Sequence, residues 1–275
     1  MHIKIALLVC CTLFTGCDER ELPTKKYNQF SYNRSHSYAD NELRIDLTNP
    51  VMCPVRIWLN SSDDTIQTMF NKVNPIALEE GADSTIIFSN IERFDDEISY
   101  TIVYGSTFKK INRTRIKLPF AKNRAYRIIQ GNNTDYTHNT DYSRYAIDFS
   151  LSVNDTISSA TDGYVVGVID QYKYGGKDKK WNPYGNSITI YDPHSGIFFQ
   201  YVHLTHKGSF VKVGDKVKSG QPIGLSGETG QTDIEHLHFN SLIPVEDKDG
   251  LKSIPVEFIE GYKSIEMGKN DIVKK

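Results

Sequence analysis

The sequence predicts an all-β protein in which a small N-terminal β-sandwich-like domain precedes a second β domain. Short runs of β-branched and aromatic residues, separated by Asn, Asp, Gly and Pro, recur through most of the 275 residues, and helical periodicity is scarce. Charged residues make up 24% and aromatic residues 11%, which is typical of an ordered globular chain rather than a disordered or membrane-embedded one. A formal net charge of -2 without a long basic stripe gives no reason to expect a nucleic-acid partner.

The N-terminus has the pattern of a secretory signal. Lys4 is followed by an apolar run over residues 5–14, which has the length of a signal-peptide core and is too short to span a bilayer. The run ends at Gly16-Cys17 and resembles a bacterial lipoprotein signal, in which residues 1–16 are removed and the Cys17 thiol carries a lipid. The alternative is an ordinary signal peptide cut near Gly16. Lipidation would leave Cys53 as the only free cysteine of the mature chain, so we expect no intramolecular disulfide.

The chain between the signal and residue 118 divides into two parts. Residues 17–40 are polar and are expected to form a tether. Residues 41–118 alternate with period two and predict the small all-β domain, in which we see no catalytic cluster and whose role the residues leave open. Its strands are expected at 43–47, 55–59, 84–88, 100–104 and 113–117.

Residues 119–265 predict the second β domain, followed by a charged tail over 266–275 that we expect to fray. Short β-branched and aromatic runs again lie between turn residues. The strands of this domain are expected at 145–153, 163–169, 187–191, 198–204, 208–213, 221–225 and 236–242.

Histidines and one aspartate gather on the predicted strands of this second domain. Five of the eight histidines lie between residues 194 and 238. His236 and His238 share one face of a strand, because side chains at i and i+2 point the same way. Apolar residues take the odd positions of 145–151, so Asp148 emerges on the opposite face. The same alternation predicts that His203 shares a face with Tyr201.

A carboxylate and several imidazoles on neighbouring strands suit Zn²⁺, which takes nitrogen and oxygen ligands at roughly 2.0–2.2 Å. Three protein ligands leave a fourth tetrahedral position for a water molecule, whose pKa the metal lowers. Each residue alone also fits a structural histidine, and His138, among Asn, Thr and Asp, also fits a solvated surface histidine. The combination and order of the residues carry the prediction.

The order of the motifs between residues 138 and 240 resembles the lysostaphin/LytM-type zinc endopeptidases of the bacterial cell wall. The matching stretches are His138, Y-A-I-D-F at 145–149, A-T-D-G-Y-V at 160–165, G-N-S-I-T-I at 185–190, Y-V-H-L at 201–204, G-D-K-V-K-S-G-Q-P-I-G at 214–224, S-G-E-T-G at 226–230 and H-L-H-F at 236–239. The resemblance implies a LytM-like antiparallel sheet, a barrel of the duplicated-hybrid-motif type, in the second domain.

Carried over residue by residue, the resemblance implies one zinc ion per chain, held by His138, Asp148 and His238. His236 would then hold or deprotonate the metal-bound water, and His203 would help to stabilise the oxyanion. One feature departs from the commoner H-x-x-x-D opening of the family, because nine residues separate His138 from Asp148. A variant with a longer loop is familiar within the family, so we retain His138 as a ligand.

Aromatic residues near these motifs are candidates for the substrate groove. We expect Tyr145, Tyr201 and Trp181 to line it. The basic, aromatic loop over 173–181 fits either a wall of the groove or a solvated loop.

The predicted function is that of a zinc metalloendopeptidase, a hydrolase that cleaves peptide cross-links of peptidoglycan. The signal predicts a cell-envelope protein, periplasmic or anchored in the outer membrane through Cys17. Its expected partners are the peptide stem or cross-link, the membrane, and an envelope protein bound through the N-terminal domain. The alternatives are a LytM-like non-catalytic regulator or scaffold for other wall hydrolases, and a peptidase of secreted proteins. Glycine bridges and D-Ala to diaminopimelate cross-links both remain open, and a lipoprotein signal without wall-targeting repeats favours the second.

Overall fold

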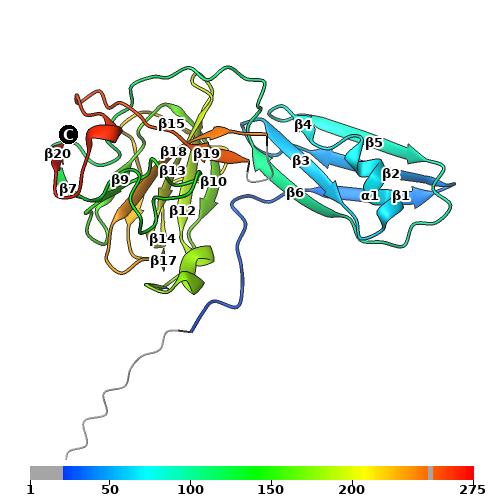
Figure 1. The fold of residues 1–275 in the computed structure, drawn as a ribbon, viewed down its shortest axis with the longest axis horizontal. Helices are drawn as coiled ribbons and strands as arrows, with labels where there is room; N and C mark the ends of the chain where they lie inside the picture. Colours follow the sequence, from blue (N-terminus) through cyan, green and yellow to red (C-terminus); the bar gives the residue numbers. More distant parts are fainter. Residues whose placement is uncertain (1–20, 247–249) are drawn as a thin grey trace, which may run out of the picture.

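The computed structural model describes residues 21–246 and 250–275 of the chain (Figure 1). The predicted signal peptide over 1–16 and Cys17 lie outside the described residues. The described chain is nearly all β, and α1 (Asp64–Asn71) is the one α-helix in these ranges. None of its helices has both the length and the apolar character to cross a membrane.

Two three-stranded sheets form the N-terminal part of the molecule, seen in blue and cyan in Figure 1. One has the order β1 (Arg34–Ala39), β2 (Glu42–Thr48), β5 (Asp83–Ser89), and the other the order β4 (Ile76–Leu78), β3 (Val55–Asn60), β6 (Ser99–Tyr104). Alternate residues of β2 and β3 meet in one buried cluster, which contains Leu43, Ile45, Ile57 and Leu59. Two sheets that share such a core form a sandwich, as the alternation predicts. Cys53 is buried in this core with a free thiol.

A nine-stranded sheet organises the C-terminal part. Its order is β15 (Lys216–Val217), β10 (Gly163–Ile169), β12 (Ser187–Asp192), β13 (Ile197–Val202), β18 (Leu237–Pro244), β8 (Ile147–Phe149), β7 (Ala125–Gln130) and β20 (Ile272–Lys274), with β19 (Leu251–Ser253) on β18. A smaller sheet orders β14 (Leu204–Ser209), β16 (Pro222–Ser226) and β9 (Thr156–Ser158). A second apolar core joins the two, with Tyr201, Leu237 and Phe239 from the large sheet and Ile157 and Ile223 from the small one.

Four short elements complete the C-terminal part. β11 (Gly175–Gly176) and β17 (Gly230–Gln231) form a parallel two-stranded ladder beside the 3-10 helix η1 (Lys179–Tyr184). A second 3-10 turn, η2 (Ser264–Glu266), precedes the last strand.

The antiparallel register of the large sheet arranges the side chains of its outer face in three rows that cross the strands. The first row contains Ile169, Ser187, Val202, His238 and Asp148. The second row contains Gly167, Thr189, Gln200 and Asn240. The third row contains Tyr191, Phe198 and Leu242. Because side chains at i and i+2 share a face, all three rows lie on the side opposite the C-terminal core.

The N-terminal part covers the third row. Tyr191, Phe198 and Leu242 belong to the same buried cluster as the core of the N-terminal sandwich. The ring of Tyr104, at the end of β6, stacks on Phe198 with centroids 5.5 Å apart, and its hydroxyl donates to the Val166 carbonyl oxygen at 3.0 Å. The guanidinium of buried Arg56 donates to the carbonyl oxygens of Gly105 and Gly250. These contacts join the two parts through apolar packing and backbone hydrogen bonds.

The prediction of a polar tether over 17–40 is wrong for its second half. Residues 34–39 form β1, which pairs along its whole length with β2. Its side chains are mostly exposed, so the strand is polar although its backbone pairs with β2. Nearer the N-terminus, the Gln29 carbonyl oxygen accepts a hydrogen bond from the Val168 amide at 2.8 Å. A composition typical of a linker therefore did not exclude pairing, because backbone hydrogen bonds do not depend on side-chain polarity.

The C-terminal tail is also ordered where fraying was predicted. Residues 272–274 form β20, which pairs with β7, and Val273 is 1% exposed. The ammonium group of Lys275 donates to the carbonyl oxygens of Leu118 and Phe120 at 2.6 and 2.7 Å. The tail therefore extends the large sheet.

Several strand bounds differ from the prediction. Residues 113–117 form no strand and contribute only an isolated bridge between Ile116 and Phe258. The strand predicted over 145–153 is limited to β8 at 147–149, and the one predicted over 208–213 lies at 204–209 as β14. In these segments the apolar alternation continues past the last paired residue. A strand ends where its neighbour stops pairing with it, and the side-chain pattern does not show that point.

Candidate metal centre

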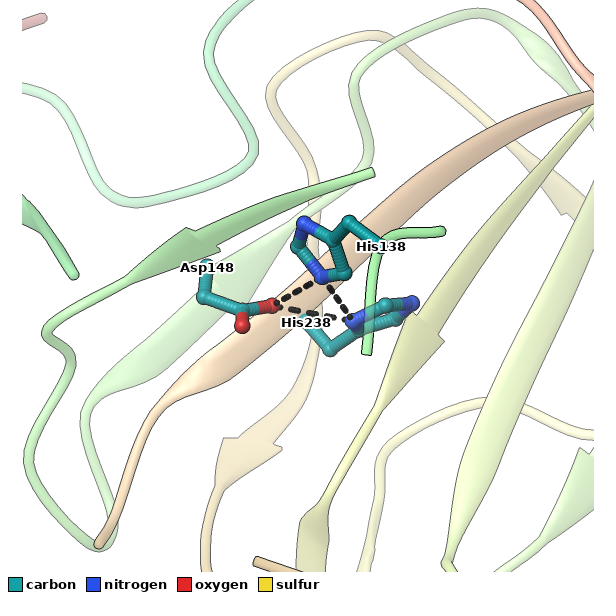
Figure 2. A group of neighbouring side chains, drawn as sticks. All are labelled: His138, Asp148 and His238. Carbon is teal, nitrogen blue, oxygen red and sulfur yellow. Dashed lines mark hydrogen bonds and ion pairs between the residues drawn. The ribbon is translucent and has the colours of Figure 1, made fainter. Parts of the chain in front are cut away.

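Three side chains converge at the end of the first row. Asp148 and His238 face each other as a directly paired couple on β8 and β18, and His138 enters from the loop before β8. Figure 2 shows the three side chains pointing toward one another. His138 Nε2 lies 3.3 Å from Asp148 Oδ1 and 3.3 Å from His238 Nδ1, and His238 Nδ1 lies 2.9 Å from Asp148 Oδ1. Two nitrogens and one oxygen therefore surround a single point.

The separations of these atoms fit a tetrahedral metal ion. Ligands placed about 2.0–2.1 Å from zinc at tetrahedral angles lie about 3.3–3.4 Å from one another, close to the observed 2.9–3.3 Å. His138 Nδ1 lies 2.8 Å from the Gly131 carbonyl oxygen, which requires a proton on Nδ1 and leaves a lone pair on Nε2. That lone pair faces a carboxylate oxygen, an arrangement of two acceptors that a cation stabilises. The three residues could hold one metal ion.

The long loop before Asp148 is closed by its own hydrogen bonds. The Asn133 amide donates to the Arg144 carbonyl oxygen at 2.7 Å, and the Ser143 hydroxyl donates to the Thr137 carbonyl oxygen at 2.6 Å. A β-bridge joins Thr134 to His138. These bonds fold the nine intervening residues back on themselves, and His138 is completely buried rather than a solvated surface histidine.

His203 and His236 lie beside the three candidate ligands. Their rings are 4.5 Å apart, and His236 Nε2 lies 3.7 Å from Asp148 Oδ1. His203 Nδ1 lies 2.7 Å from the Thr229 carbonyl oxygen, and His236 Nδ1 lies 2.9 Å from the Ile234 carbonyl oxygen. We infer from these acceptors that each Nδ1 carries the proton, which leaves each Nε2 with a lone pair. The structure thus brings all five predicted residues together.

His203 reaches this position by a route that strand alternation does not predict. The prediction that it shares a face with Tyr201 is wrong. Tyr201 is fully buried in the C-terminal core, and its hydroxyl accepts a hydrogen bond from the Ala160 amide at 2.8 Å. His203 follows the end of β13 with φ of +67°, a left-handed conformation that is uncommon outside glycine. This backbone turn carries the imidazole around to the face of the metal centre.

The pKa values of these groups follow from burial and mutual contact when no metal ion is bound. Burial would raise the pKa of Asp148, but the His236 charge and hydrogen bonds with His138 and His238 hold it well below its ordinary value. Burial lowers the pKa of His203 to about 3, and neighbouring His236 and His238 add to the shift. His203 is therefore a neutral imidazole at physiological pH.

The pKa values of the two imidazoles that contact Asp148 shift in opposite directions. Burial lowers the pKa of His238, and its contact with Asp148 only partly offsets the loss. Burial also acts to lower the pKa of His138, but its contact with Asp148 outweighs it, so this pKa is raised. His138 is therefore the candidate ligand that holds a proton most strongly.

A cleft of about 1140 Å³ opens over the first row and contains Asp148, His203, His236 and His238 in its lining. None of the three predicted groove aromatics lines it. Tyr201 lies in the core, Tyr145 is only half-buried outside the cleft, and Trp181 is buried at 4% exposure against Gly176. An aromatic ring on a β domain finds more apolar contact in a core than at an open surface, which explains the position of Tyr201. The loop over 173–181 contributes Lys179 to the lining.

Tyr142 and Gln29 are among the lining residues that were not predicted. The Tyr142 hydroxyl donates to Gln200 Oε1 at 3.1 Å, on the second row beside the metal centre. Gln29 belongs to the N-terminal segment and lines the same cleft. Sequence carries no signal for Gln29, because its position depends on packing against residues far along the chain.

Part of the chain is similar in sequence to known proteins. Residues 142–248 match the model of Peptidase family M23. Over 99 residues the chain is 37% identical to the glycyl-glycine endopeptidase ALE-1 of Staphylococcus capitis. The aligned stretch is 36% of this chain and 24% of that protein. Over 106 residues it is 30% identical to the peptidoglycan DD-endopeptidase ShyB of Vibrio cholerae. That aligned stretch is 38% of this chain and 22% of that protein.

A solved structure is also similar. The catalytic domain of the antimicrobial peptidase lysostaphin from Staphylococcus simulans aligns with a TM-score of 0.34 and 24% identity, over 48% of this chain and 88% of that one. The chain spans less than a quarter of the length of the two curated relatives. The matched family range begins after His138.

Proposed function

We propose that this chain, in which residues 142–248 match the model of Peptidase family M23, is a zinc-dependent endopeptidase that hydrolyses peptide cross-links of bacterial peptidoglycan. The observation that carries the proposal is the convergence of three candidate ligand atoms with two further imidazoles in one cleft. The names of the relatives support the substrate class, since one is a glycyl-glycine endopeptidase and another a peptidoglycan DD-endopeptidase.

In this proposal His138, Asp148 and His238 hold the zinc ion. Zinc bound there would supply an acidified water and polarise the substrate carbonyl. The Asp148 carboxylate contributes the negative charge of the ligand set, and its lowered pKa favours the ionised form. The bond from His138 Nδ1 to the Gly131 carbonyl oxygen fixes the tautomer that presents Nε2.

His236 and His203 divide the proton transfers. The Ile234 carbonyl oxygen holds His236 Nδ1, so Nε2 is placed to accept the proton of the attacking water. His203 Nε2 is also an acceptor at rest, because Nδ1 is bound to the Thr229 carbonyl oxygen and the pKa of about 3 keeps the ring neutral. His203 can donate to the developing oxyanion only after it has taken up a proton released by the attacking water. Its oxyanion role therefore follows proton transfer instead of preceding it.

The proposed substrate bond is the D-Ala to diaminopimelate cross-link, with cleavage in the cell envelope by a chain anchored through lipid on Cys17. The signal-like N-terminus and the similarity to a peptidoglycan DD-endopeptidase are the grounds for this choice. An envelope protein bound through the N-terminal sandwich belongs to the same proposal. A regulator without activity is not favoured, because His203 and His236 accompany a complete set of candidate ligands.

Digestion of isolated peptidoglycan tests the proposal. The mature chain is stripped of metal, reloaded with zinc and incubated with cross-linked walls, and the released muropeptides are identified by mass spectrometry. We expect soluble products with zinc and none after metal removal, with cleavage between D-Ala and diaminopimelate. Intact walls after prolonged digestion by the zinc-loaded chain would overturn the proposed activity, and products cut at another bond would overturn the proposed substrate.

A further inference from the structure

One wall of the cleft comes from a segment that precedes both β domains. Residues 27–30 lie along the half of β10 that β15 leaves unpaired, where the Gln29 carbonyl oxygen accepts from the Val168 amide at 2.8 Å. The Tyr27 amide donates to the Tyr172 hydroxyl at 2.9 Å, and the two rings meet edge to face at 5.2 Å. The Phe30 ring lies 5.6 Å from that of Tyr104. Contacts on both sides of Gln29 therefore fix the segment.

The side chain of Gln29 lies over the second row of the large sheet. Its Oε1 is 3.0 Å from the Thr189 hydroxyl and 3.2 Å from the Tyr104 hydroxyl, so residues of both parts of the molecule hold it. Gly167 makes the room, because a Cβ at this position would collide with Gln29 Oε1 and the Tyr104 hydroxyl. Hydrogen bonds among the described residues engage the side-chain oxygen of Gln29. The residue also lines the cleft.

Tyr142 occupies the equivalent place at the other end of the second row. Its hydroxyl donates to Gln200 Oε1 at 3.1 Å, and the Asn240 side-chain amide donates to its carbonyl oxygen at 2.7 Å. Gln29 and Tyr142 thus stand along the same side of the first row, which forms the floor of the cleft. A substrate that lies on this floor crosses the strands from β8 toward β10.

Strand spacing gives the distance between Gln29 and the cleaved bond. His238 is on β18, Thr189 on β12 and Gly167 on β10, two and three strands away in the sheet order. At about 4.8 Å per strand the separation is about 10–14 Å, which an extended peptide covers in about three to four residues. The side-chain nitrogen of Gln29, which the hydrogen bonds to Oε1 do not engage, can donate to a backbone carbonyl oxygen of a peptide at that distance.

We infer that Gln29 is a specificity-determining residue that hydrogen-bonds an extended peptide about three to four residues from the cleaved bond. The inference rests on the proposed function only in taking a peptide as the occupant of the cleft. It means that the segment before the sandwich completes the substrate-binding site of the peptidase domain. The family-matched range alone would lack this wall.

Substrate length is the variable that tests this inference. The Gln29→Leu variant of the full chain removes the polar amide and keeps the bulk. It is compared with wild type on a cross-linked peptide that has four residues on each side of the cleaved bond, and on versions trimmed to two residues on one side or the other. We expect about a three- to tenfold loss of kcat/KM on the long peptide, mostly in KM, and no loss on the version trimmed on the β10 side.

Gln171→Leu is the matched control, because Gln171 is an exposed glutamine of the same region that does not line the cleft. It is expected to leave every substrate unchanged. An equal loss with all peptides, or a lowered melting temperature that accounts for the loss, would assign Gln29 a structural role and overturn the inference. No loss with the long peptide would overturn it as well.

Binding separates this inference from the proposed activity. Anisotropy of the same peptides, fluorescently labelled, is measured with wild type and Gln29→Leu. If wild type binds the long peptide but cleaves none, the proposed function fails, while weaker binding of the long peptide alone by Gln29→Leu still supports the wall. If wild type binds the long and trimmed peptides equally, the inference that Gln29 contacts the peptide is overturned, whether or not cleavage occurs.

Discussion

The two ends of one sheet face use the same strands for opposite purposes. At one end the first row presents Ser187, Val202 and His238 to an open cleft. At the other end, four residues along the same strands, the third row presents Tyr191, Phe198 and Leu242 to the core of the N-terminal sandwich. The strands and the face are the same, so the difference lies in what covers them. The end with an apolar cover carries stability, and the end without it is free to carry polar groups that bind and react.

The second row is the boundary between these two ends. Thr189, Gln200 and Asn240 are buried polar residues, and each bonds to a residue that lies outside the large sheet. Gln29 and Tyr142 are those residues. This row explains how an apolar interface can end beside a charged site without leaving buried polar groups unpaired.

The largest effect on activity is expected from removing the carboxylate at the open end. Asp148→Asn takes away the one anionic ligand atom, so we expect loss of bound zinc and a fall in activity of about a thousandfold or more. Metal analysis and wall digestion measure the two effects. Asp162→Asn, a surface aspartate paired with Lys218, is the control and should keep both. Full activity of Asp148→Asn with zinc bound would show that the centre lies elsewhere.

Removing an imidazole that is not a candidate ligand should separate chemistry from metal binding. His236→Ala is expected to lower kcat about 10²- to 10⁴-fold while one zinc ion per chain remains, because it deletes the proton acceptor and no ligand atom. His206→Ala, outside the cleft lining, serves as the control. If His236→Ala loses zinc in proportion to activity, the division of roles is wrong.

At the covered end the expected change is in stability instead. Phe198 is fully buried against Tyr104 and Tyr191, so Phe198→Ala should lower the free energy of unfolding by about 3–5 kcal/mol. Activity per folded molecule should remain close to wild type. Urea unfolding measures the free energy of unfolding. Wall digestion, normalised to the amount of bound zinc found by titration, measures activity per folded molecule. Phe108→Ala is the control, since Phe108 is 91% exposed and should change stability by less than about 0.5 kcal/mol.

Acid sensitivity of the metal-free chain is the smallest expected effect. The pKa of His203 falls from 6.5 to about 3 in the folded chain, so the unfolded chain binds the proton more readily. This contribution to stability is complete above about pH 6.5 and is lost as pH falls toward 3, at about 1 kcal/mol per pH unit. The lowered pKa of His238 acts in the same direction, and the raised pKa of His138 acts in the opposite one.

Urea unfolding at several pH values between 7 and 4 measures this slope. His203→Gln removes the titrating ring and should make the slope shallower than in wild type. His194→Gln, in an exposed turn between β12 and β13, should leave it unchanged. An unchanged slope in His203→Gln would mean that His203 is not held neutral in the folded chain.

Strand positions and two of the candidate ligands follow from local pattern. Period-two alternation predicts the core-facing residues of β2 and β12, and it puts Asp148 and His238 on the face opposite the core. The division of the chain at residue 118 and the role of the N-terminal sandwich stay predictions. Alternation fails at His203, because a positive φ at the strand end turns the side chain to the other face.

By itself, the sequence determined the β class, the strand residues of the metal centre and the resemblance that links them. These depend on backbone geometry that repeats every two residues, and on motifs that are contiguous in the chain. Tertiary structure alone decided how a largely exposed loop buries His138, that the C-terminal tail joins the sheet, and that Gln29 forms a wall of the cleft. Each of these depends on hydrogen bonds and packing with groups that local sequence does not identify, such as the Gly131 carbonyl oxygen or the space that Gly167 leaves open.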